Sequence, residues 1–146
     1  MKQKARFYTF FLSMVFTGNY MYAQDYNDCV TKVPVFIKAE TAPEYRGQFQ
    51  HYFEDAFKGD TLSYNGEIVV TFVIDSIGNS CCTKIENCNS AILSEKLKEA
   101  TDKMSGWKPA TQNHHLVRFY YRLKFVFSGS NFQVTPILLN SSLHNG

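Results

Sequence analysis

The segment GEIVVTFVIDSIG, residues 66–78, decides the fold of this chain. Successive side chains of a strand point to opposite faces, so apolar residues at alternate positions predict one buried face. These residues are Ile68, Val70, Phe72 and Ile74. Asp75 and Gly78 then predict a tight turn, because Asp favours the first position of a turn and Gly adopts positive φ. A second strand over residues 79–86 is expected to pair back antiparallel, with an inward face formed by Cys81, Thr83 and Ile85.

A helix is predicted on each side of this hairpin. Between residues 49 and 57 the apolar side chains are spaced as on one face of a helix, and Gly59 is placed to end it. Residues 93–104 show the same spacing, with Ser94 as the expected N-cap. The apolar face of this second helix is formed by Leu93, Leu97, Ala100 and Met104. Both helices would therefore present one apolar face to the sheet.

The last strand is predicted over residues 116–127, where two kinds of side chain alternate. One face is wholly apolar and is formed by Val117, Phe119, Tyr121, Leu123, Phe125 and Phe127. The other carries a row of cationic side chains with one aromatic, here named the basic stripe: Arg118, Tyr120, Arg122 and Lys124. Such a row either guards a solvated face against pairing or forms a docking surface for an extended, acidic peptide that adds as a strand.

The order helix, strand, turn, strand, helix, strand predicts the fold class. Two amphipathic helices can cover the apolar face of a three-stranded antiparallel sheet, which makes a two-layer α+β domain. We expect this domain over residues 43–127, after a signal peptide at 1–23 and an extended lead-in at 24–42. Residues 128–146 are expected to form a flexible tail, with a short further strand over 132–139 as the alternative.

The N-terminus predicts export to the periplasm or cell envelope. Three cations precede an apolar stretch at residues 7–16, and Ala23 is the expected last residue before cleavage. The alternative is an uncleaved anchor, although the apolar stretch is shorter than the roughly 20 residues that span a membrane. Cleavage leaves 12 cationic against 13 acidic residues, a net charge near −1. This balance argues against nucleic-acid binding, and membrane contact is expected only through an uncleaved anchor.

Export also permits disulfide bonds among the four cysteines, which are Cys29, Cys81, Cys82 and Cys88. One or two bonds can form, with Cys29 and Cys88 as candidates, but the spacing leaves the pairing open, and Cys81 and Cys82 are expected to be either structural disulfide partners or buried thiols. The spacing matches no zinc-binding pattern. It also lacks the Cys-x-x-Cys arrangement that is typical of thiol exchange.

Residues typical of catalysis are scattered along the chain. The histidines are His51, His114, His115 and His144. No sequence pattern of a nucleophile elbow is present. We therefore predict a protein without catalytic residues, cofactor or metal site. Trp107 is expected to fill the end of the core and not to bind a ligand. An enzyme remains an alternative, because small α+β sheets host many activities.

Several of these motifs occur in an order and spacing that resemble one known family. They are Pro43-Glu44-Tyr45-Arg46-Gly47, the segment 66–78, the helix at 93–104, and Trp107-Lys108-Pro109-Ala110 with Gln112-Asn113. Together they are similar to the C-terminal domain of TonB-type energy transducers over residues 43–127. In this chain His114 takes the place of the family's usual Gly after Asn113.

The resemblance implies a periplasmic domain without a cofactor. It implies that the last strand, which carries Arg118, Tyr120 and Arg122, binds the plug-side peptide of an outer-membrane transporter by strand addition. Because residues 24–42 can span at most about 70 Å, we expect a stand-alone domain and not a complete transducer. The alternative from another class is a secreted, disulfide-containing scaffold or interaction protein that has no transporter partner.

Overall fold

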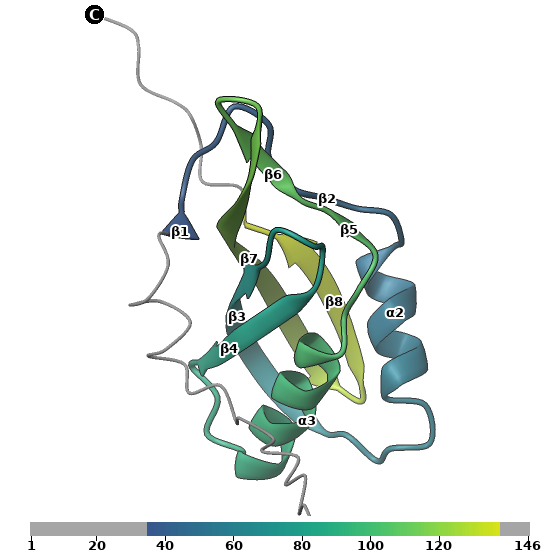
Figure 1. Cartoon of the computed structure of the whole chain (residues 1–146). Helices are drawn as coiled ribbons and strands as arrows, with labels where there is room; N and C mark the ends of the chain where they lie inside the picture. The colour runs from purple at the N-terminus through teal and green to yellow at the C-terminus, as the bar shows by residue number, and fades with distance from the viewer. Residues whose placement is uncertain (1–34, 138–146) are drawn as a thin grey trace, which may run out of the picture.

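Figure 1 shows the computed structural model, which describes residues 35–137. Within this range, six strands form one mixed sheet and two more form a short antiparallel ladder. The strands of the sheet are β1 (Val35–Phe36), β3 (Tyr64–Ile74), β4 (Ser80–Glu86), β6 (Ala110–Gln112), β7 (His115–Gly129) and β8 (Asn131–Pro136). The ladder joins β2 (Glu44–Tyr45) to β5 (Trp107–Lys108). Neither of the two helices found between residues 35 and 137 has the length and hydropathy needed to cross a membrane.

The long strand β7 organises the sheet. It pairs antiparallel with β3 along Phe119–Gly129, and β4 pairs antiparallel with the far side of β3. Its other neighbours are β8, which pairs with it antiparallel, and β1, which pairs with it in parallel. The short strand β6 pairs with the start of β7 through a hairpin.

Helices α2 (Phe49–Ala56) and α3 (Ala91–Asp102) cover one face of this sheet (Figure 1). The alternating residues of the segment 66–78 form the floor of the core, as their spacing predicts, and Ile68, Val70, Phe72 and Ile74 are fully buried. Phe53 of α2 packs edge-to-face on Phe125, with 4.8 Å between ring centroids. Helix α3 begins earlier than expected, because Ser90 and not Ser94 is its N-cap. The Ser90 Oγ accepts a hydrogen bond from the Leu93 N–H at 3.3 Å.

The predicted fold class is wrong in its sheet. The prediction has three antiparallel strands, whereas the described residues form a mixed sheet of six strands and a separate two-stranded ladder. Four of the five additional strands, β1, β2, β5 and β6, have only two or three residues and pair with a partner distant in sequence or across a turn. Strand β8 forms because Phe132 and Val134 pack against the core and complete its edge. Residues 131–136 are therefore part of the sheet, which agrees with the alternative of a short further strand and not with a flexible tail over these residues.

The turn after β3 brings two of the motifs that carry the family resemblance into contact, namely the segment 66–78 and the motif that begins at Trp107. The Asp75 Oδ1 accepts hydrogen bonds from the Ile77 and Asn79 N–H groups at 3.0 and 2.9 Å. Gly78, at φ +89°, accepts a hydrogen bond at its carbonyl from the Trp107 N–H at 3.2 Å. The backbone of the turn therefore packs directly on strand β5.

Trp107 is buried, with 3% of its surface exposed, and lies at the centre of an aromatic cluster. Its ring centroid is 5.0 Å from that of Tyr45 and 4.8 Å from that of Tyr121. Phe49 of α2 lies 5.7 Å away. The tryptophan therefore fills the end of the core, as its position in the sequence predicts.

Candidate functional site

The basic stripe lies on the face of the sheet opposite the helices. Residues of β7 alternate between the two faces, and Leu123, Phe125 and Phe127 occupy the buried one. The stripe residues Arg118, Tyr120, Arg122 and Lys124 therefore share the other face, and all are half-buried. Sequence alternation alone is enough to bring these four side chains together.

The cations of the stripe lie close to carboxylates on the neighbouring strands. Arg122 Nη2 lies 3.5 Å from Glu86 Oε2 of β4. Lys124 Nζ lies 3.8 Å from Glu67 Oε1 of β3. A further cation of β4, Lys84, lies 3.4 Å from Glu86 Oε1. The cations on this face outnumber the carboxylates, so the face favours an acidic ligand.

Strand β7 is an interior strand of the sheet and not an edge. Residues 123–128 pair with β3 and with β8, which must therefore lie on opposite sides of β7. Near the start of the strand, β1 pairs with Arg118 and Phe119. The Arg122 carbonyl accepts a hydrogen bond from the Ile137 N–H at 2.9 Å. Strand addition to β7, which the resemblance implies, would require one of these neighbours to leave.

Cys81 faces the basic stripe, contrary to the expectation that it points toward the helices. It pairs with Val73, whose side chain lies on the outer face of β3. A register shift between Thr71 and Val73 leaves Cys82 and Thr83 opposite a single residue of β3, which is a β-bulge. The bulge reverses the alternation, so Thr83 lies on the inner face while Cys81 lies on the outer one.

The three cysteines of the described range differ in redox state. Cys82 is disulfide-bonded and has φ +57°. Cys81 and Cys88 carry thiols, so Cys88 is not part of a disulfide as the sequence had allowed. Burial raises the pKa of the Cys81 thiol, and a hydrogen bond with Arg118 opposes this shift only in part. The remaining cysteine, Cys29, lies outside the described residues.

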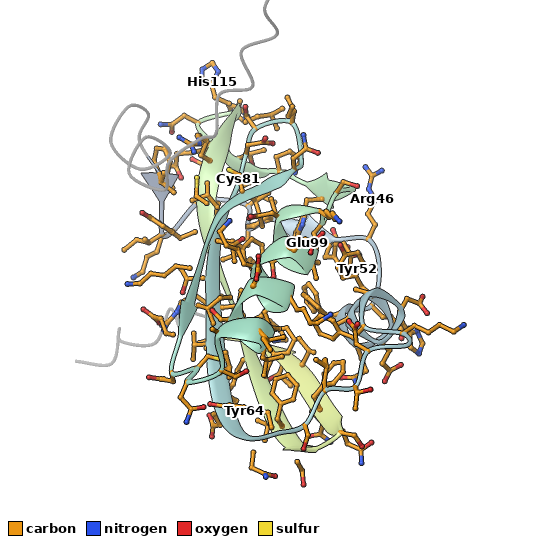
Figure 2. All side chains as sticks on the ribbon, turned by 90° about the horizontal axis from the view of Figure 1, so that it is seen from below. Arg46, Tyr52, Tyr64, Cys81, Glu99 and His115 are labelled. Atoms are coloured by element: carbon orange, nitrogen blue, oxygen red, sulfur yellow. The ribbon has the colours of Figure 1, made fainter. Side chains whose placement is uncertain are left out.

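The histidines are not brought together. His51 is exposed on α2, and His114 and His115 are exposed at the tip of the β6–β7 hairpin, which Figure 2 shows at the end of the molecule. His144 lies outside the described residues. Within residues 35–137, no three side chains of the types that bind metals cluster together.

A groove that the sequence did not predict separates the two helices. It has a volume of about 450 Å³, with Tyr52 and Glu99 among the residues that line it (Figure 2). Lys96 Nζ lies 2.7 Å from Asp60 Oδ1 across one end of this groove. The Tyr52 hydroxyl donates a hydrogen bond to the Ala100 carbonyl at 2.7 Å. These polar groups already have partners within the domain, and their contacts across the groove hold the α2 segment to α3.

Two partly buried tyrosines predict a loss of stability at alkaline pH: Tyr52 at this groove, and Tyr121 in the aromatic cluster around Trp107. Burial raises the pKa of Tyr52 and of Tyr121 above the ordinary value of 10.0. The folded state therefore holds these protons more tightly than the unfolded state does, and this stability is complete below pH 10 and is lost as the pH rises above it. We expect the urea midpoint to fall between pH 9 and about pH 11. The double variant Tyr52→Phe/Tyr121→Phe should show a shallower fall, and an unchanged slope would contradict this assignment.

Comparison with family models, with curated proteins and with solved structures finds no match for this chain. The similarity to the TonB C-terminal domain therefore rests on the motifs themselves. The arrangement of charges and strands at the candidate site is consequently the basis for inferring its function.

Proposed function

We propose that this domain is a non-enzymatic protein-interaction module of the cell envelope, which binds an extended acidic segment of a partner on the basic stripe. The observation that carries the proposal is the excess of cationic side chains on a sheet face that neither helix covers. Arg122 is suited to this role because a guanidinium can hold a carboxylate through two parallel hydrogen bonds. The side chain of Lys124, with 40% of its surface exposed, is accessible beside it.

The acidic segment would lie across the stripe and would not need to extend the sheet. Its carboxylates would compete with Glu86 and Glu67 for the cations that these residues now contact. Val126, which is exposed at the end of the same face, offers an apolar contact. Each exposed ion pair contributes only about 0.2–1 kcal/mol, so the stripe would provide charge selectivity and rapid, salt-sensitive association more than high affinity.

The family motifs support an outer-membrane transporter of the TonB-dependent kind, or another envelope protein, as the partner. A second candidate function is a secreted, disulfide-containing scaffold, which the disulfide at Cys82 favours. A photo-crosslinker at position 126, used in the native envelope, distinguishes these two functions. Capture of a transporter's periplasmic N-terminal segment would support the first function. Capture of soluble proteins alone would favour the scaffold.

A charge reversal at Arg122 is expected to weaken this binding. The probe is a labelled octapeptide in which valine and threonine alternate and the two central threonines are replaced by glutamates. We expect Arg122→Glu to raise its dissociation constant about tenfold, because one attraction is replaced by a repulsion. Fluorescence anisotropy measures the binding.

The matched control is Lys103→Glu, which makes the same change of net charge on an exposed residue of the segment after α3. This variant should bind the acidic octapeptide nearly as well as the unmodified protein does. Equal losses for the two variants would show a general charge effect and would exclude the stripe as the binding surface. Thermal unfolding of both variants confirms that the fold is kept.

A further inference from the structure

The outer edge of β8 is hydrogen-bonded to one side chain of α2. The Gln50 Nε2 donates to the Phe132 carbonyl at 2.9 Å, and the Val134 N–H donates to the Gln50 Oε1 at 3.0 Å. Residues two apart on an edge strand direct their backbone groups to the same side, here away from β7. A carboxamide carries the same donor and acceptor as a peptide group. Gln50 therefore occupies the place that the backbone of a neighbouring strand would take.

A crevice continues this edge toward the end of α2. Its volume is about 350 Å³, and its apolar lining includes Phe57, Leu62 and Phe132. Its two carboxylates belong to Glu54 and Asp60. Asp60 is paired with a lysine at 2.7 Å. Glu54 accepts a hydrogen bond from Gln50 at 2.8 Å, and the ion pairs of residues 35–137 include none that involves it.

We propose that the edge of β8 beside α2 is a second docking site, for an extended partner segment that carries a lysine or arginine next to an apolar residue. A peptide group of this segment replaces the Gln50 carboxamide on Phe132 and Val134. The apolar side chain enters the crevice over Phe57, and the cation meets Glu54. The preference for a cation is opposite to that of the basic stripe, so this site does not depend on the proposed function.

The exchange keeps the number of backbone hydrogen bonds constant. Two bonds from Gln50 are lost at the strand edge, and two from the partner are formed. The released glutamine regains side-chain freedom, which offsets part of the cost of ordering the peptide. The competing explanation is that Gln50 only guards an exposed edge against pairing, a task that polar groups commonly perform. The two explanations differ in the expected behaviour of a variant that lacks the Gln50 side chain.

The experiment uses the full chain and two labelled octapeptides in which valine and threonine alternate. One has its two central threonines replaced by lysines, the other by glutamates. We expect Gln50→Ala to bind the lysine peptide about fivefold more tightly, because the competing side chain is gone. Glu54→Lys should weaken that binding about tenfold, and Arg122→Glu should leave it unchanged. Fluorescence anisotropy measures binding, and thermal unfolding confirms that each variant is folded.

The matched control is Asp55→Lys, which makes the same charge change on the neighbouring residue of α2, toward the groove between the helices. It should bind the lysine peptide like the unmodified protein. Equal losses for Asp55→Lys and Glu54→Lys would overturn the proposal. It would also be overturned if Gln50→Ala bound no more tightly, or if it formed dimers without binding peptide, since that result would identify Gln50 as an edge guard. Loss of acidic-peptide binding in Arg122→Glu alone would bear only on the basic stripe.

Discussion

Gly78→Ala is expected to lower the free energy of unfolding by about 3–5 kcal/mol, among the largest effects of any single substitution in this chain. A Cβ atom at this position would lie 2.3 Å from the Trp107 carbonyl oxygen, a distance at which the backbone must move. The positive φ of Gly78, +89°, adds a cost of about 1–2 kcal/mol for any residue with a Cβ. Urea denaturation measures the loss, and the melting temperature should fall by more than about 10 °C.

Gly59→Ala separates the two causes of this loss. Gly59 has nearly the same φ, +86°, but no atom lies within 4 Å of a Cβ placed there. We therefore expect this control to cost only about 1–2 kcal/mol, the conformational part alone. Similar losses in the two variants would show that the close packing of the turn on β5 contributes little. That result would contradict the inference that the close packing of Gly78 on Trp107 stabilises the fold.

Those parts of the fold that depend on local spacing could be predicted from the sequence. The alternation in β3 and β7, the turn after β3 and both helices follow from side-chain periods of two and 3.6 residues. Strands β1 and β6 could not be predicted, because they have only two and three residues and form through partners distant in sequence or across a turn. Such pairing is decided by the assembled sheet and leaves no period in so short a segment.

The bulge in β4 shows why one face assignment was wrong. Strict alternation places Cys81 on the same face as Thr83, since they are two residues apart. The extra residue at Cys82 reverses that relation. The residue with positive φ at this bulge is Cys82 and not a glycine, so the sequence contains no glycine that would indicate the bulge. A bulge of this kind depends on the pairing register between two strands, and the residue pattern of one strand alone does not contain that register.

The two candidate sites also differ in how far the sequence alone predicts them. The four residues of the basic stripe share a face through alternation in one strand, so the sequence was sufficient to group them. Their contacts with Glu86 and Glu67 depend on the register between β7 and its neighbours. Gln50, by contrast, contacts two residues of β8 that are far from it in the sequence: Phe132 is 82 positions away and Val134 is 84 positions away. Only the packing of α2 against the sheet edge brings these groups together.

Cys82→Ser is expected to lower the free energy of unfolding by about 2–4 kcal/mol under non-reducing conditions. The bond at Cys82 restricts the unfolded chain, and its removal restores conformational freedom that folding must then overcome. Serine keeps nearly the same volume and can adopt the same backbone conformation, so the bulge should persist. Urea denaturation of the two proteins without reductant measures the difference. Addition of reductant should lower the free energy of unfolding of the unmodified protein to that of the variant, and it should leave the value for the variant unchanged.

Cys88→Ser is the matched control, because Cys88 carries a thiol and its Sγ donates a hydrogen bond to the Ser90 carbonyl at 3.3 Å, which a hydroxyl can also do. Its effect should stay within about 1 kcal/mol. If Cys82→Ser is destabilised but reductant leaves the unmodified protein unchanged, the loss comes from the bulge and not from the bond. If reductant reproduces the loss, the domain needs an oxidising compartment for its full stability. That dependence would agree with the export that the N-terminal sequence predicts, and it would make the periplasm a better place for this domain than the reducing cytosol.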